Sequence, residues 1–126
     1  MEGRGRAIAG RYGEDAACRY LEGLGHTVLE RNWRGGHLEL DIISQAPDGI
    51  HFVEVKTRVA PVSASPEENV GWTKQKRMVA AANKYLNGKG GGQGFREVFF
   101  DVIAVTLDGG KTEIAYFPSA FVPIYY

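Results

Sequence analysis

Residues 38–58, LELDIISQAPDGIHFVEVKTR, constrain the fold of this 126-residue chain more than any other stretch. Two runs rich in apolar and β-branched residues, 38–44 and 50–57, flank Ala-Pro-Asp-Gly, a sequence typical of a type I turn. The pattern predicts a β-hairpin. If the turn is centred between Pro47 and Asp48, Asp41 on the first strand stands opposite Glu54 on the second.

Two carboxylates face each other in this register. Directly opposed residues of an antiparallel pair have Cβ atoms about 4.5–5.5 Å apart. Asp41 and Glu54 therefore repel unless a cation lies between them or one of them is protonated. A hard divalent ion such as Mg²⁺, which takes oxygen ligands, removes this conflict. Lys56 shares the face of Glu54 because side chains alternate along a strand, and a one-residue bulge would separate the two acids.

Apolar periodicity and turn residues predict the other elements. Helical patterns occupy residues 7–24, ending before Gly25, and 74–86, with Thr73 as N-cap. Further strands are predicted at 26–31, 97–107 and 112–117. Residues 32–36 are predicted to form a turn, and the apolar strand at 97–107 is typical of a sheet interior. This order predicts an α/β fold, a mixed β-sheet with flanking helices.

The whole chain, residues 1–126, is predicted to form one domain, because its length supports a single hydrophobic core. Composition predicts a frayed N-terminus at 1–6 and flexible loops at 59–69 and 88–95. The first loop directly follows the second hairpin strand and is a candidate flap over a substrate. The aromatic tail at 117–126 holds two prolines and is predicted to pack across the core, and a homodimer contact is the alternative.

Charge and cysteine content bound the function. Fifteen basic and fifteen acidic residues cancel, but residues 69–96 contain six Lys or Arg and no Asp or Glu. The single cysteine, Cys18, excludes an internal disulfide and fits a reducing compartment. The three histidines lack a metal-ligand spacing with it, so no zinc site is expected. No apolar run approaches the roughly 20 residues of a membrane span, and no signal peptide is seen. We expect a cytoplasmic protein that does not contact membranes.

Glu14 lies on the inward stripe of the first predicted helix, one turn before Ala17. A carboxylate on a buried helix face is costly unless it is paired. Both a structural role and a place in the acidic cluster of the hairpin therefore stay open for Glu14. Asp15 lies between Arg11 and Arg19, which is the pattern of a solvated, salt-bridged face.

Asp41 followed by Glu54-Val55-Lys56 resembles the PD-(D/E)xK signature of the restriction-endonuclease-like nuclease superfamily. More closely, the chain resembles the small bacterial YraN or UPF0102 family, which is similar in turn to archaeal Holliday junction resolvases. The matching pieces are Gly13-Glu14, Asn32-Trp33-Arg34, residues 39–43 (ELDII), residues 52–58 (FVEVKTR), Lys74-Gln75 and Asp101-Val102. Many family members carry Gly where this chain has Leu38, a departure that leaves the acidic positions intact.

The resemblance implies a restriction-endonuclease-like core and an endonuclease, a hydrolase that cuts DNA, branched or structured DNA included, with Mg²⁺ or Mn²⁺. Asp41, Glu54 and the main-chain carbonyl of Val55 are the expected metal ligands. Lys56 would orient or deprotonate water and stabilise developing negative charge. Glu14 would reach the cluster through water or at a second metal. The alternative is a non-catalytic nucleic-acid-binding module on a nuclease scaffold.

Basic residues around the second helix are candidates for contact with the nucleic acid. The candidate set is Arg58, Lys74, Gln75, Lys76 and Arg77. Contacts to phosphates position a duplex without reading bases, and binding through them weakens steeply with salt. The alternative is a solvated helix face. Trp33 and Trp72 could stack on bases, but packing in the core or against a loop is the favoured interpretation.

Overall fold

The computed structural model describes residues 3–61, 70–88 and 97–123. The elements are α1 (Gly3–Gly23), β1 (Thr27–Gly35), β2 (Leu38–Ala46), β3 (Gly49–Val59), α2 (Trp72–Asn87), β4 (Val98–Asp108) and β5 (Lys111–Phe121). The five strands form one sheet in the order β1-β2-β3-β4-β5. Strands β3 and β4 are parallel, and the other neighbours are antiparallel. The predicted mixed α/β architecture is confirmed.

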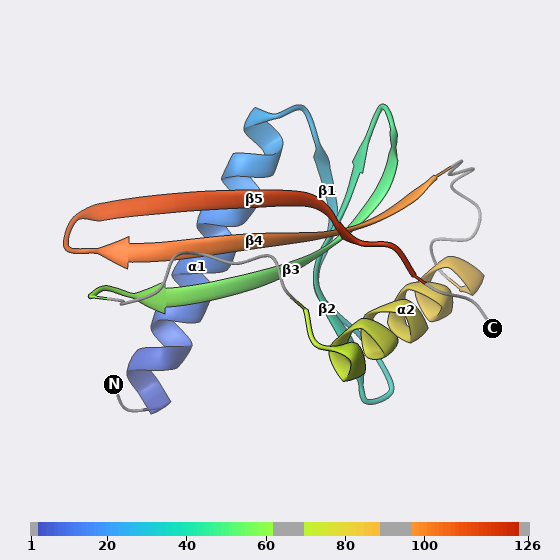
Figure 1. Cartoon of the computed structure of the whole chain (residues 1–126), viewed down its shortest axis with the longest axis horizontal. Coiled ribbons are helices and arrows are strands. Elements are labelled where there is room, and N and C mark those ends of the chain that lie inside the picture. The colour runs from blue at the N-terminus through green and yellow to red at the C-terminus, as the bar shows by residue number, and fades with distance from the viewer. Residues whose placement is uncertain (1–2, 62–69, 89–96, 124–126) are drawn as a thin grey trace.

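The two helices cover opposite faces of the sheet. Phe52 packs in a core that includes Met78 and Tyr85 of α2. Its neighbour on β3, Val53, packs in a second core with residues of α1 such as Leu21. This division follows from the alternation of side chains along a strand. Figure 1 shows α1 crossing behind β3, β4 and β5, and α2 lying beside β2.

The predicted hairpin is present, and its register is the predicted one. Ile42 pairs with Val53, and the ladder continues to the pair Ala46–Gly49 at the turn. β4 pairs with β3 on one side and with β5 on the other, and its residues from Phe100 to Thr106 are buried. The prediction that this strand lies in the sheet interior is therefore also confirmed.

Element boundaries in the N-terminal half differ from the sequence predictions. α1 begins at Gly3, so residues 3–6, predicted to be frayed, belong to the helix. β1 continues to Gly35, so most of the turn predicted at residues 32–36 is strand. Asn32 has a φ of 51°, and Asn tolerates this conformation better than most residues. A local kink in β1 therefore replaces the predicted turn.

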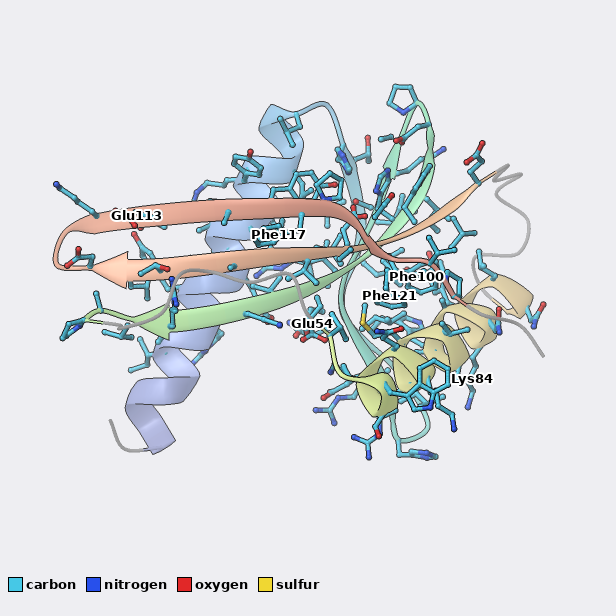
Figure 2. The ribbon with its side chains drawn as sticks, in the orientation of Figure 1. Glu54, Lys84, Phe100, Glu113, Phe117 and Phe121 are labelled. Carbon is cyan, nitrogen blue, oxygen red and sulfur yellow. The ribbon has the colours of Figure 1, made fainter. Side chains whose placement is uncertain are left out.

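Boundaries in the C-terminal half differ as well. α2 begins at Trp72 with Gly71 as N-cap, so Thr73, the predicted cap, lies inside the first turn. β5 runs four residues past its predicted end to Phe121, passing Pro118 on an edge strand, where no ladder hydrogen bond is lost. Within the described part of the predicted tail, Phe121 packs on the core, where it stacks on Phe100 with ring centroids 5.0 Å apart (Figure 2).

The predicted flexible loops fall mainly outside the described residues, at 62–69 and 89–96, as do tail residues 124–126. At their edges, Val59 ends β3 and Gly88 closes α2 by donating its N–H to the carbonyl of Tyr85. None of the helices in the described part of the chain is long and apolar enough to cross a membrane.

Gly13 allows α1 to pack closely on β3. A Cβ at this position would overlap Thr57 Oγ1 and lie 2.9 Å from Thr57 Cγ2. Because a β-branched side chain inside a sheet cannot move away easily, we expect Gly13→Ala to lower the free energy of unfolding by about 1–3 kcal/mol. Urea denaturation followed by circular dichroism measures this change.

Gly10 provides the matched control on the same helix. A Cβ at Gly10 would meet nothing within 4 Å, so Gly10→Ala should raise the free energy of unfolding by up to about 1 kcal/mol through helix propensity alone. Thr57→Ala should restore much of the stability lost in Gly13→Ala. Equal effects of the two glycine substitutions would contradict this account of the helix–sheet contact.

Candidate functional site at a fork in the sheet

The sheet divides into two branches just beyond the hairpin ladder. Pairing between β2 and β3 ends at Ile42–Val53. From there β2 stays paired with β1 as far as Leu38, and β3 stays paired with β4 as far as Val59. Figure 1 shows the two branches diverging, with the start of α2 near the fork. Residues immediately past the last pair therefore have backbone groups that no strand partner satisfies.

Asp41 is the first residue of β2 beyond this ladder. Its Oδ2 atom accepts a hydrogen bond of 2.9 Å from the backbone N–H of Val55. The Asp41 carboxylate thus takes the place of a strand partner for β3. This bond holds the Asp41 side chain between the branches, next to the residues on either side of Val55.

Glu54 lies beside Asp41 in the fork. Its side chain is only 15% exposed, and Figure 2 shows it between β3 and the start of α2. Burial, the negative charge of Asp41 and a hydrogen bond between the two carboxyl groups raise the pKa of Glu54 from 4.5 to about 7. The two acids of the predicted pair therefore lie within hydrogen-bonding distance, and the charge of Asp41 favours the protonated form of Glu54.

Lys74, in the first turn of α2, forms an ion pair with Glu54 of this pair. Its Nζ atom lies 3.0 Å from Glu54 Oε2. Burial alone would lower the pKa of Lys74, but the hydrogen bond and charge of Glu54 and the charge of Asp41 raise it above its usual value. The sequence predicts that Lys74 contacts DNA phosphates, and its local pattern gives no signal for this ion pair.

Glu14 approaches from α1 but has its own partner. In its hydrogen-bonding orientation the Asn32 amide donates to both Glu14 carboxylate oxygens, at 2.9 and 3.1 Å. Burial and the charge of Asp41 raise the pKa of Glu14, whereas Arg31 and Asn32 lower it. Within the described residues, no three His, Cys, Asp or Glu side chains gather closely enough to hold a metal ion. The structure therefore pairs Asp41 with Glu54 and keeps Glu14 at the edge of the site.

β3 also carries the predicted metal ligand Val55, the predicted catalytic Lys56 and the predicted nucleic-acid contact Arg58. Val55 uses its N–H for Asp41. Lys56 is half-buried, and strand alternation places it on the same face as Glu54. Farther along, Arg58 Nε donates to Thr106 Oγ1 at 3.0 Å, which holds the guanidinium against β4.

The residues of α2 that were predicted to contact nucleic acid have different partners in the structure. Gln75 donates its side-chain amide to the carbonyl of Val70 at 2.7 Å, so it stabilises the start of the helix. Lys76 Nζ lies 5.8 Å from the centre of the Trp72 ring. Arg77 is exposed and lines, with Lys74, His37, Leu38 and Glu39, a polar cavity of about 350 Å³.

Trp33 and Trp72 differ in how far their rings are buried. Trp33 packs against the α2 core with its ring 5.4 Å from that of Tyr85, edge to face, so the packing prediction is confirmed there. Trp72 is 50% exposed and contacts a cation, Lys76. Its ring is therefore accessible beside the basic residues of α2.

Sequence reasoning missed a second polar cluster, on the α1 side of the sheet. Buried His51 contacts Asp101 at 2.6 Å and Asp48 at 2.8 Å. Asp101 also accepts hydrogen bonds from the Tyr116 hydroxyl and the Ser119 N–H. Burial would lower the pKa of His51, but the two aspartates raise it. Asp101 within an apolar strand was the available signal, because a buried carboxylate needs partners.

The fold and site thus define a mixed α/β domain with a buried acidic pair at the fork of its sheet. The family model described as "Uncharacterised protein family UPF0102" matches residues 13–105, and the chain belongs to this family. The family membership predicted from the sequence motifs is confirmed.

Relatives from several bacteria support this assignment. A UPF0102 protein of Anaeromyxobacter dehalogenans is 38% identical over 120 residues, which are 95% of this chain and 88% of the relative. One from Bacteroides thetaiotaomicron is 42% identical, with coverages of 90% and 92%. One from Oleidesulfovibrio alaskensis is 46% identical over 83% of this chain, which spans about half (51%) of that relative.

A solved structure shows a weaker likeness. The SPO1766 protein of unknown function from Silicibacter pomeroyi has a TM-score of 0.33 and 16% sequence identity. The match covers 80% of this chain and 65% of that one. A likeness at this level does not establish a shared fold.

The shifted pKa of Glu54 has a measurable consequence for stability. Because folding raises this pKa from 4.5 to about 7, the stabilisation by the bound proton is complete below pH 4.5 and is lost as the pH rises through 7. In EDTA, the wild type should lose roughly 2–3 kcal/mol of unfolding free energy relative to Glu54→Gln between pH 4.5 and pH 8. Urea denaturation across this pH range measures the difference.

Glu39→Gln is the control for this pH dependence. The Glu39 side chain is 58% exposed and pairs with Arg34 at 3.4 Å, so removing its charge should leave the pH profile unchanged. The contributions of His26 and His51 are common to all three proteins and cancel in the comparison. A Glu54→Gln profile parallel to that of the wild type would show that folding does not raise the pKa of Glu54.

Proposed function

We propose that this protein is a divalent-metal-dependent endonuclease that hydrolyses phosphodiester bonds of DNA, including branched or structured DNA. The observation that carries the proposal is the contact between Asp41 and Glu54 in the fork. Lys56 follows Glu54 by two residues on β3. Two acids forced together in a buried position are costly for folding. Such a cost is typical of a site arranged for chemistry rather than for stability.

The donor set of the fork fits Mg²⁺ or Mn²⁺. Mg²⁺ is bound in proteins by one or two carboxylates, keeps several of its waters and takes further oxygens from substrate phosphates. Asp41 and Glu54 supply two carboxylates of this kind, and the carbonyl of Val55 is a proposed third ligand. A divalent ion there would compete with the proton that Glu54 retains near neutral pH, because it stabilises both ionised carboxylates.

Each candidate site residue has a distinct role in this proposal. When bound, the metal lowers the pKa of a water and neutralises phosphate oxygens. Lys56 places an ammonium on the Glu54 face, where it stabilises negative charge that develops on the phosphate. The Val55 N–H holds Asp41 in position, and the Asn32 amide holds Glu14 at the edge of the site.

The restriction-endonuclease-like fold and kinship with Holliday junction resolvases form part of the proposal. Support comes from the order α1-β1-β2-β3-α2-β4, in which a helix precedes a three-stranded antiparallel unit and α2 connects the parallel strands β3 and β4. The acidic residues of the signature lie on β2 and β3, at the point where these strands separate.

One observation favours the alternative, a nucleic-acid-binding module without activity. Asp41 is satisfied by Val55, and Glu54 by Lys74, with no metal required. In that case the acidic pair would be a structural clamp between the branches of the sheet and α2. The endonuclease and the inactive binding module predict different results in a DNA cleavage assay.

The test is hydrolysis of labelled linear, flapped and four-way DNA with Mg²⁺ or Mn²⁺. The wild type should nick or cut at least one substrate. Asp41→Asn and Glu54→Gln should each lower the rate at least about 100-fold, because each removes a carboxylate from the metal site. The cleavage rate is measured on gels, and DNA binding is measured by fluorescence anisotropy on the same samples.

Glu113→Gln, at an exposed position of β5 away from Glu54 (Figure 2), serves as the control and should cut at a rate close to that of the wild type. Binding of DNA by both site variants would separate loss of chemistry from loss of folding. If the wild type binds these DNAs and leaves all of them intact with either metal, the module without activity is the correct interpretation.

A further inference from the structure

Lys74, one of the predicted DNA-binding residues, forms an ion pair with the acidic site. Its Nζ lies 3.0 Å from Glu54 Oε2, and the charge of Asp41 acts on it as well. A lysine in this position compensates the two carboxylates of the fork. One ammonium cannot fully neutralise both the Glu54 carboxylate and a DNA phosphate at the same time.

We propose that Lys74 is a displaceable counter-ion, which neutralises the Asp41–Glu54 pair without metal and is released to bind a DNA phosphate when a divalent ion occupies the pair. The inference deepens the proposed function and rests on it. It adds a regulation of the site. Metal binding raises the affinity for DNA because it releases Lys74, and DNA binding raises the affinity for the metal. Such coupling is reciprocal by thermodynamic necessity.

The surroundings of Lys74 permit this exchange. Its side chain is 45% exposed, whereas that of Glu54 is 15% exposed. Four flexible methylenes allow an ammonium to change partners with little strain. Lys74 also lines the polar cavity of about 350 Å³ that Arg77 and His37 border on the side of β2. This cavity gives the released ammonium a place near a second cation, where a phosphate can bind both.

Other basic residues of α2 lack this link to the acidic pair. Lys76 lies over the Trp72 ring, one position beyond Gln75. A metal ion in the fork therefore has a direct effect on Lys74 and only a distant electrostatic effect on Lys76. Lys76 is thus a matched control of the same residue type on the same helix.

The experiment is a double-mutant cycle for DNA binding in EDTA, which needs no cleavage. Glu54→Gln should release Lys74 without metal, and we expect DNA affinity to rise about 5- to 10-fold with a salt slope steeper by about 1. In a Lys74→Met background the same substitution should change affinity less than about twofold. In a Lys76→Met background the full gain should remain. Fluorescence anisotropy at several salt concentrations gives all these values.

Removal of a negative charge could by itself favour DNA, and the cycle separates this effect. A gain from Glu54→Gln that persists in Lys74→Met would overturn the inference. A second measurement, calorimetric titration of Mn²⁺, should show tighter binding to Lys74→Met than to the wild type, because the competing cation is gone. Weaker or equal Mn²⁺ binding would also overturn it.

These outcomes are independent of catalysis. DNA binding that shows the coupling without any cleavage would leave the inference intact and refute the proposed endonuclease. Cleavage of DNA without coupling would refute only the inference. If none of the proteins binds DNA, both proposals are wrong.

Discussion

The hydrogen bond from the Val55 N–H to Asp41 is the interaction on which the site depends. Where β2 leaves β3, the edge of β3 that faced β2 loses its strand partner while the other edge stays paired with β4. An unsatisfied buried N–H is costly. The Asp41 carboxylate replaces that partner at 2.9 Å. By doing so it lies next to Glu54, so the need to satisfy one backbone group brings two acids together.

The same fork explains why elements distant in the chain meet at this point. β3 continues past the fork with β4, so it carries Lys56 away from β2. α1 approaches closely because Gly13 has no side chain to clash with Thr57, and this contact brings Glu14 to the rim. α2 begins on the opposite face and brings Lys74 to Glu54. The site is therefore built by four elements, β2, β3, α1 and α2, around a gap in one ladder.

The sequence predicted the parts of this arrangement that local interactions determine. The turn at Pro47 and the β-branched runs beside it act over a few residues, so the hairpin register and the meeting of Asp41 with Glu54 could be predicted. The starts of α1 and α2 were displaced by two or more residues, because packing and backbone caps decide them more than propensity does.

Contacts between distant segments could not be predicted in the same way. The ion pair of Lys74 with Glu54 depends on how α2 packs against the sheet, which the local sequence does not determine. His51 and Asp101 are 50 residues apart in the chain and meet through the parallel pairing of β3 with β4. Asp101 in an apolar strand indicated that some partner was needed, but not that His51 and Tyr116 would provide it.

The most direct test of the account is a crystal structure of the protein soaked in MnCl₂, with anomalous scattering recorded for manganese. The account predicts one strong anomalous peak in the fork, with oxygens of both Asp41 and Glu54 at roughly 2.0–2.6 Å and with Lys74 Nζ moved away from Glu54. Crystals that show the Lys74–Glu54 ion pair intact at saturating manganese, with no peak between the carboxylates, would contradict it.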